Sequence, residues 1–360
     1  MDVPVAHAPH LTYNPGYLLP HSFSWGRILF STLVLLEKEP PAMPEFSAQV
    51  QALRSMIESG EFISEDADDL IQLAKPAVTL PYSNSTPTEH GSYFGGRPYL
   101  PEGSTWPVAK SGQPLLHVIQ LNFADIVRHV RAEGASESEA TLDGLIPESG
   151  IFQLFVGADP LSGGFDSDSP GDGMEIRYIP EPAEGFGNHS FPGPHTAKPA
   201  AFDEQHEDYC SPFSEDIGEV MNSPISLSSA VAMIPPTDQA AYETLKSRKG
   251  DDFLENFDYF DELVELRKAA SHKSDIMLGG FPAFAQDPTE PDGYVHFLEI
   301  DSTYLEEEEL PFEIMWGDLG VAHVFLHPDA LKKMHAGEAV VYRSENTGTT
   351  DGAVFSWDCG

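Results

Sequence analysis

A block of three short motifs occurs twice in this chain, and it decides the fold. The first occurrence reads GGRP at residues 95–98, LLHVIQLN at 115–122 and GIFQLFV at 150–156. The second reads GGFP at residues 279–282, YVHFLEID at 294–301 and GVAHVFL at 320–326. In each, a Gly-Gly-x-Pro turn precedes two apolar runs in the same order, as expected of a duplicated β unit. The sequence therefore predicts two related β units, at about residues 90–157 and 275–328.

The composition indicates a globular, soluble and strongly acidic protein. Hydrophobic residues make up 41% of the 360 residues, enough for one large domain or two ordinary ones. Asp and Glu number 58 against 19 Lys and Arg, a formal net charge of -39. This charge repels phosphates and anionic lipids, so we expect no nucleic acid and no membrane partner. We expect the partner to be a protein or a small-molecule ligand.

The cysteines and apolar runs favour a cytoplasmic protein. Cys210 and Cys359 are far apart, and neither has a second Cys or His at zinc-finger spacing. The longest apolar run, residues 28–36, is shorter than the roughly 20 residues that cross a bilayer. We expect no disulfide framework and no membrane span.

The local composition along the rest of the sequence divides the chain into an N-terminal extension and a domain. Residues 1–43 are rich in Pro and aromatic residues and predict a poorly ordered N-terminal extension to a domain over residues 44–360. A helical insert at about 236–270 separates the two β units. The periodicity predicts helices over 46–59, 65–74, 125–133, 238–245, 252–270 and 328–331, and further strands over 174–179, 339–342 and 353–357.

Several motifs resemble those of the YwqG-like family. They are FGGRPYLP at 94–101, GGFPAFAQ at 279–286, LEIDS at 298–302, MWGDLGV at 315–321 and WDC at 357–359. The resemblance covers roughly residues 47–360. It implies an α+β, mainly β fold, a duplicated antiparallel β-sheet roll with peripheral helices. It implies no catalytic residue and no cofactor, and the family pattern does not fix a histidine at His323 or His327.

The repeat also predicts a candidate polar pocket. His117 and His296 hold equivalent positions, and each is followed three residues later by a polar residue, Gln120 or Glu299. Symmetry between the units would bring these four side chains around one pocket. The alternative, which we favour, is a pair of hydrogen-bonded histidines within the sheets.

The second unit adds Trp316, Asp318 and His323 to the candidate pocket. Glycines flank Asp318, which favours a tight turn whose carboxylate accepts backbone N–H groups, although a carboxylate presented in a cleft stays open. His323 and His327 lie four apart on a predicted strand. Their side chains would be about 13 Å apart, too far to share one metal ion.

Other metal patterns fail, so we expect no cofactor. Asp166, Asp168 and Asp172 imitate a calcium loop, but Arg177 stands where a bidentate Glu is needed. The spacings of His189, His195, His206 and Cys210 match no common zinc site.

The sequence favours a non-enzymatic binding or protein-interaction module. No nucleophile elbow, phosphate-binding loop, dinucleotide fingerprint or His-Glu-x-x-His motif is present. The alternative is a hydrolase-like or metal-assisted enzyme that uses Asp318 with His323, or His117 with His296.

Overall fold

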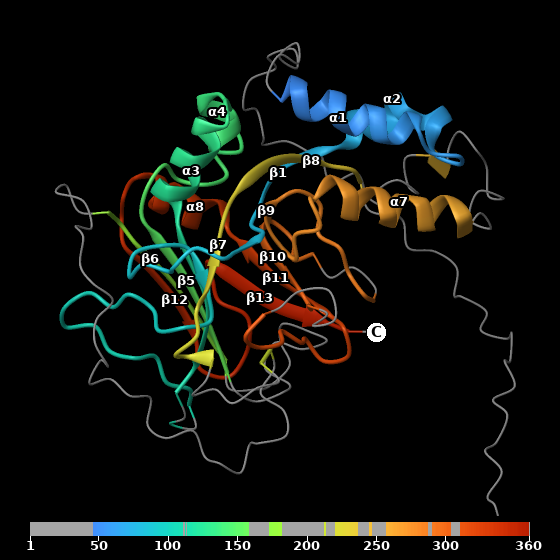
Figure 1. Cartoon of the computed structure of the whole chain (residues 1–360). Coiled ribbons are helices and arrows are strands. Elements are labelled where there is room, and N and C mark those ends of the chain that lie inside the picture. The colour runs from blue at the N-terminus through green and yellow to red at the C-terminus, as the bar shows by residue number, and fades with distance from the viewer. Residues whose placement is uncertain are drawn as a thin grey trace, which may run out of the picture. The chain divides into compact units, whose positions relative to one another are not determined.

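The apolar runs pair into two antiparallel sheets, seen in the computed structural model of the chain (Figure 1). In the part of the chain that the structure describes, sheet A has six strands, in the order β13 (Ala353–Asp358), β11 (Val321–Leu326), β10 (Val295–Asp301), β9 (Ile276–Gly279), β1 (Lys75–Thr79) and β8 (Ala230–Ile234). Sheet B has seven within the same residues, in the order β12 (Val340–Ser344), β6 (Met174–Ile179), β5 (Ile151–Val156), β4 (Leu116–Asn122), β3 (Tyr93–Phe94), β7 (Ile225–Leu227) and β2 (Tyr82–Ser83). The predicted α+β, mainly β class is confirmed.

The structure describes residues 46–110, 112, 114–157, 173–181, 212–213, 220–236, 245–246, 257–286, 290–303 and 310–359. The predicted N-terminal extension and the apolar run at 28–36 lie outside these residues. So do the calcium-like aspartates Asp166, Asp168 and Asp172, the loop residues His189, His195, His206 and Cys210, and parts of the helices predicted over 238–245 and 252–270.

The two repeated blocks occupy corresponding places in the two sheets. In sheet B, β3, β4, β5 and β6 lie side by side, and in sheet A, β9, β10, β11 and β13 do the same. The neighbour of β3 is β7, which precedes the second block in the chain, and the neighbour of β9 is β1, which precedes the first block. Each sheet is therefore completed by a strand from the other half of the chain.

A β-bulge falls at the same point in β4 and β10. The pairing of β4 with β5 shifts between His117 and Ile119, and that of β10 with β11 shifts between His296 and Leu298. A bulge inserts one extra residue, so residues three apart across it face the same side of the sheet. This places the polar residue that follows each histidine on the same face as the histidine.

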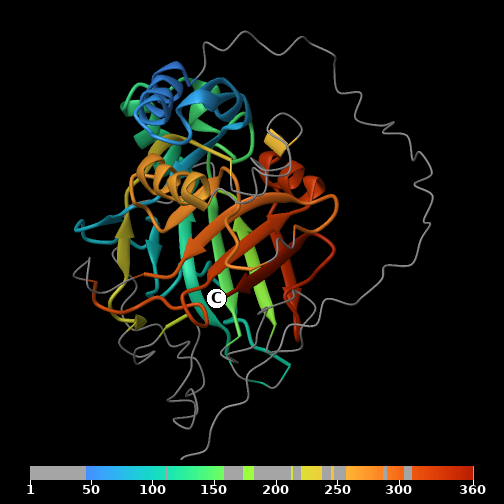
Figure 2. The same ribbon diagram turned by 90° about the vertical axis from the view of Figure 1, so that its right-hand side faces the viewer.

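The core lies between the two sheets. Phe152 of β5 packs on Phe297 of β10 with ring centroids 5.1 Å apart, and Phe123 packs on Phe297 at 6.2 Å. All three side chains are fully buried and belong to one continuous apolar cluster that draws on both sheets. Figure 2 shows strands of sheet A, in orange and red, in front of those of sheet B.

Helices complete the unit formed by residues 43–360. Those that fall within the described residues are α1 (Ser47–Glu58), a 3-10 turn (Ser64–Asp66), α2 (Ala67–Leu73), α3 (Phe123–Ala132), α4 (Glu137–Ala140), α7 (Phe257–Ala270) and α8 (Pro328–His335). Both α1 and α7 lie against β8 (Figure 1). The Glu262 carboxylate of α7 accepts N–H bonds from Glu61, Phe62 and Ile63, which fixes α7 to the α1–α2 connection.

Most predicted elements are confirmed within the described residues. The predicted helix over 125–133 begins two residues earlier, at Phe123, because the Asn122 side chain accepts the Asp125 N–H and caps it there. The described helices include none long and apolar enough to cross a membrane.

Candidate functional site

Three potential metal ligands converge on the face of sheet A that points away from the core. They are His296, Glu299 and His323, and their nearest ligand atoms all lie within 4.8 Å of one another. Glu299 is the direct partner of His323 across β10 and β11, and the bulge turns His296 to the same side. The residues that flank His323 in β11, Ala322 and Val324, point into the core.

Glu299 is held by a cation and by a backbone amide. The Arg267 Nη2 atom donates to both Glu299 oxygens, at 2.7 and 2.9 Å, and the Ala283 N–H donates to Oε2 at 2.8 Å. The side chains of Arg267 and Glu299 are only 14% and 9% exposed. The pair is therefore a buried, charge-assisted contact between α7 and β10.

Residues 281–286, which we call the cover segment, lie over this cluster. The segment leaves β9 through Gly279 and Gly280, whose φ angles of 73° and 71° are in the left-handed region that favours glycine. The Phe284 ring packs on His323 at 4.5 Å between centroids. At the end of the segment, Gln286 N donates to Asp358 Oδ2 at 2.7 Å.

Both histidines of the cluster are neutral and hold free lone pairs. Burial lowers the pKa of His323 to about 4 and that of His296 well below its usual 6.5. Arg267 lowers both further, whereas the Glu299 carboxylate opposes the lowering at His323. Near the rings, the carbonyls of Gly280 and Ala283 oppose this lowering without meeting full hydrogen-bond geometry, and no ring nitrogen has a hydrogen-bond partner among the described residues. Two neutral imidazoles and a carboxylate form a ligand set typical of zinc and similar cations.

Sheet B carries the same arrangement in neutral form. Gln120 and Gln153 pair across β4 and β5 as Glu299 and His323 do across β10 and β11. Gln120 Oε1 accepts the Tyr99 N–H at 2.8 Å, and Gln153 Nε2 donates to Gln120 Oε1 at 2.9 Å and to the Tyr99 carbonyl at 2.7 Å. Tyr99 is the third residue after its Gly-Gly pair, the same position that Ala283 holds in the second unit.

The histidines of the two units also correspond. His117 packs on Phe155 at 5.3 Å, as His296 packs on Phe325 at 5.5 Å. His117 Nδ1 lies 2.9 Å from the Gly95 carbonyl, a hydrogen bond that no His296 nitrogen makes to any described residue. The first cluster is thus bonded to its own backbone through His117 Nδ1, although His117 Nε2 and Gln153 Oε1 have no hydrogen-bond partner among the described residues. In the second cluster, neither nitrogen of either imidazole has one.

The two clusters do not meet in one pocket. The structure brings together His296, Glu299 and His323 of the predicted residues, and it places His117 and Gln120 on sheet B. Each unit contributes its histidine to its own sheet, on the face opposite the core that the sheets share. The predicted convergence of His117 and Gln120 with His296 and Glu299 is therefore not seen.

Trp316 and Asp318 also lie apart from the cluster. Trp316 is buried in the core against Phe355, with ring centroids 5.7 Å apart. Asp318 is exposed in the predicted tight turn. The carboxylate beside His323 is Glu299.

His327 has a separate structural role. Its Nδ1 accepts the Asp329 N–H at 3.2 Å and caps α8. His327 is not part of the metal-ligand cluster, which agrees with the prediction that it cannot share an ion with His323.

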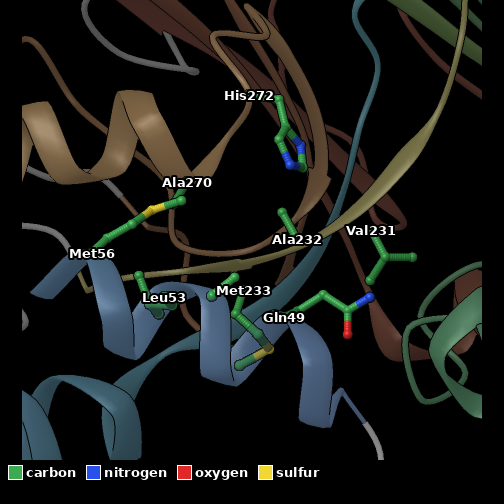
Figure 3. A pocket seen from close by; sticks show the side chains of 9 residues that line it. Gln49, Leu53, Met56, Val231, Ala232, Met233, Ala270 and His272 are labelled. Atoms are coloured by element: carbon green, nitrogen blue, oxygen red, sulfur yellow. The ribbon is translucent and has the colours of Figure 1, made fainter.

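A small pocket lies elsewhere, between α1 and β8 (Figure 3). Its volume is about 50 Å³, and its lining is mostly apolar, with Leu53, Met56 and Met233 among the side chains and His272 at its edge. None of the predicted site residues lines it.

Sequence reasoning missed Arg267, Phe284 and Asp358. Arg267 lies in the helical insert and has no local signal, because its partner Glu299 is 32 residues away. The cover segment did have a signal, since the Gly-Gly-x-Pro turn occurs in both units and precedes a polar strand position in each.

A family model described as a domain of unknown function, DUF1963, matches residues 92–342. The chain belongs to the DUF1963 family. The matched region contains both clusters, the cover segment and α7, and it confirms the YwqG-like resemblance expected from the motifs. A search of curated proteins gives no match. The DUF1963 description assigns no activity, so the functional argument rests on the geometry of the cluster.

Proposed function

We propose that this DUF1963 protein is a non-enzymatic binding protein that holds a divalent transition-metal cation, Zn²⁺ or a similar ion, on His296, Glu299 and His323. Two observations support this. No nitrogen of either buried imidazole has a hydrogen-bond partner among the described residues, and one nitrogen of each ring and one Glu299 oxygen lie within 4.8 Å of one another. A buried polar group without a partner costs about 1–3 kcal/mol of folding free energy, so a ligand that binds these nitrogens would offset that cost.

The first unit supports a ligand over a purely structural role. The same strand positions hold Gln120 and Gln153 there, and these amides bond to each other and to the Tyr99 backbone. The two amides thus use most of their hydrogen-bonding groups, and of their four polar atoms Gln153 Oε1 is the one without a partner among the described residues. Two imidazoles and a carboxylate supply what amides lack, which is strong donor atoms for a cation.

The matching bulges, Gly-Gly turns and strand orders also support an origin by doubling. We include this in the proposal: an ancestral β unit was duplicated, and the second copy acquired metal-binding side chains at positions where the first keeps amides.

Burial favours binding over catalysis. His296 and Glu299 are each 7% exposed and His323 is 1% exposed, beneath the cover segment. A dehydrated cation is small enough to enter such a site, whereas an ester or phosphate substrate would need the cover segment to move away. A metal-assisted hydrolase is the second candidate, because three protein ligands leave a fourth position for water. It would use Glu299 in place of Asp318.

Metal titration tests the proposal. Full-length protein stripped with a chelator is titrated with Zn²⁺ by calorimetry and with Co²⁺ by visible absorption. We expect one ion per chain and intense Co²⁺ bands, both lost in His323→Gln and unchanged in the control His327→Gln. Absence of stoichiometric binding, or binding unaffected by His323→Gln, would refute it. Turnover of ester or phosphate substrates by the loaded protein, absent in His323→Gln, would favour the enzyme.

A further inference from the structure

The carboxylate assigned to the metal already binds a cation of the protein itself. Arg267 Nη2 contacts both Glu299 oxygens, and the Ala283 N–H takes a further position on Oε2. A metal ion that coordinates Glu299 must share these oxygens with the guanidinium or displace it.

The charges favour displacement. Glu299 and Arg267 together are neutral, and a divalent ion added to them would leave two cationic groups on one carboxylate in a largely desolvated site. Like charges repel more strongly away from bulk water, so the guanidinium and the metal ion compete for the same negative charge.

Arg267 is able to leave without moving its helix. Its Nη1 atom has no hydrogen-bond partner among the described residues, so Glu299 is the contact that holds the guanidinium. The helix is fixed independently, through the bonds of Glu262 to residues 61–63 and through the buried side chains of Leu263 and Leu266.

We propose that Arg267 is an internal competitor for the metal, so that occupancy of Glu299 alternates between the guanidinium and the cation. This inference rests on the proposed function. Arg267 keeps the carboxylate paired when the metal is absent and weakens the site when the metal is present, which makes the ion exchangeable. The site is then suited to reversible binding of a cation rather than to a permanent structural ion.

Three variants of the full chain test this with Co²⁺ and Zn²⁺ as probes. We expect Arg267→Gln to tighten binding by at least about tenfold, since it removes the competing charge. Arg267→Lys, which keeps the charge, should stay near the wild type. Arg54→Gln removes an arginine from an exposed ion pair on α1 and is the matched control, with unchanged affinity.

The outcomes separate the two proposals. Equal or weaker binding by Arg267→Gln, with the wild type binding normally, overturns the competition and leaves the metal site standing. Binding by neither protein overturns both. If Arg267→Gln does not fold, a crystal structure of the metal-loaded wild type decides: Arg267 should be withdrawn from Glu299, and an intact Arg267–Glu299 contact beside a bound ion would overturn the inference.

Discussion

The Arg267–Glu299 pair should dominate the stability of the site in metal-free protein, and Glu299→Gln measures it. Glutamine keeps an oxygen that can accept the Ala283 N–H, as Gln120 accepts the Tyr99 N–H in the first unit. What it removes is the charge that compensates Arg267. Removing one partner of a buried ion pair costs about 3–5 kcal/mol, and with side chains 14% and 9% exposed we expect the lower end, about 3 kcal/mol.

A double-mutant cycle isolates this energy. Urea unfolding of chelator-treated protein, followed by tryptophan fluorescence and far-UV circular dichroism, is compared for Glu299→Gln, Arg267→Met and the double variant. We expect the double variant to be at least about 2 kcal/mol more stable than the sum of the single losses predicts, because it leaves no unpaired charge. Asp68→Asn, which breaks the exposed Arg54 pair at 2.9 Å, is the control and should cost less than about 1 kcal/mol. Additive single effects, or a loss below about 1 kcal/mol in Glu299→Gln, would show that the pair is not the buried contact described above.

Further outcomes follow from other parts of the fold. Burial lowers the pKa of His117 from 6.5 to about 4, so as the pH falls the unfolded chain binds a proton on His117 before the folded protein does. The contribution of neutral His117 to the free energy of unfolding is therefore complete above pH 6.5 and falls by about 3 kcal/mol as the pH drops to about 4. His117→Gln should flatten the pH dependence of the urea midpoint over that range, and an unchanged slope would contradict this. Gly320→Ala should destabilise the protein by more than about 2 kcal/mol in thermal melts, because its Cβ would fall inside van der Waals contact with the Asp358 carbonyl oxygen and lie 2.6 Å from that of Trp316. An unchanged melting temperature would contradict this. The double substitution Gln120→Glu with Gln153→His should give sheet B a second Co²⁺ site, and unchanged stoichiometry would argue against equivalence of the two clusters. Raising NaCl from about 0.1 to about 1 M should raise the melting temperature, because salt screens the repulsion within a net charge of -39; a flat or falling melting temperature would contradict this.

The strands that carry the repeat could be predicted from the sequence alone. Apolar runs at 116–122 and 295–301 have one register in which their large side chains reach a core, and the structure pairs both runs with the apolar run that follows them. The helix over 46–59 could be predicted equally well, because its period puts Leu53 and Ile57 on one buried face.

The residues that form the site could be predicted from the sequence only in part. His296 and Glu299 were singled out by their spacing, but residues three apart on a regular strand face opposite sides, and only the bulge at Phe297 reverses this. A bulge leaves no reliable mark in a single sequence. Arg267 depends on the packing of α7 against sheet A, which is a tertiary contact that periodicity does not encode.

The contrast between the units also explains why the second cluster needs Arg267. Replacing an amide such as Gln120 by a carboxylate at the same buried position would leave an uncompensated charge, which is far more costly than a neutral polar group. The compensating arginine comes from α7, which precedes the second block in the insert between the two units. The Glu299 carboxylate, its Arg267 partner and two imidazoles without hydrogen-bond partners among the described residues lie together on sheet A, whereas the equivalent positions of β4 and β5 hold amides. Because the position 179 residues earlier in the same chain, Gln120, is occupied without a charge, the charge at Glu299 is what the proposed metal binding requires and the amide pair does not supply.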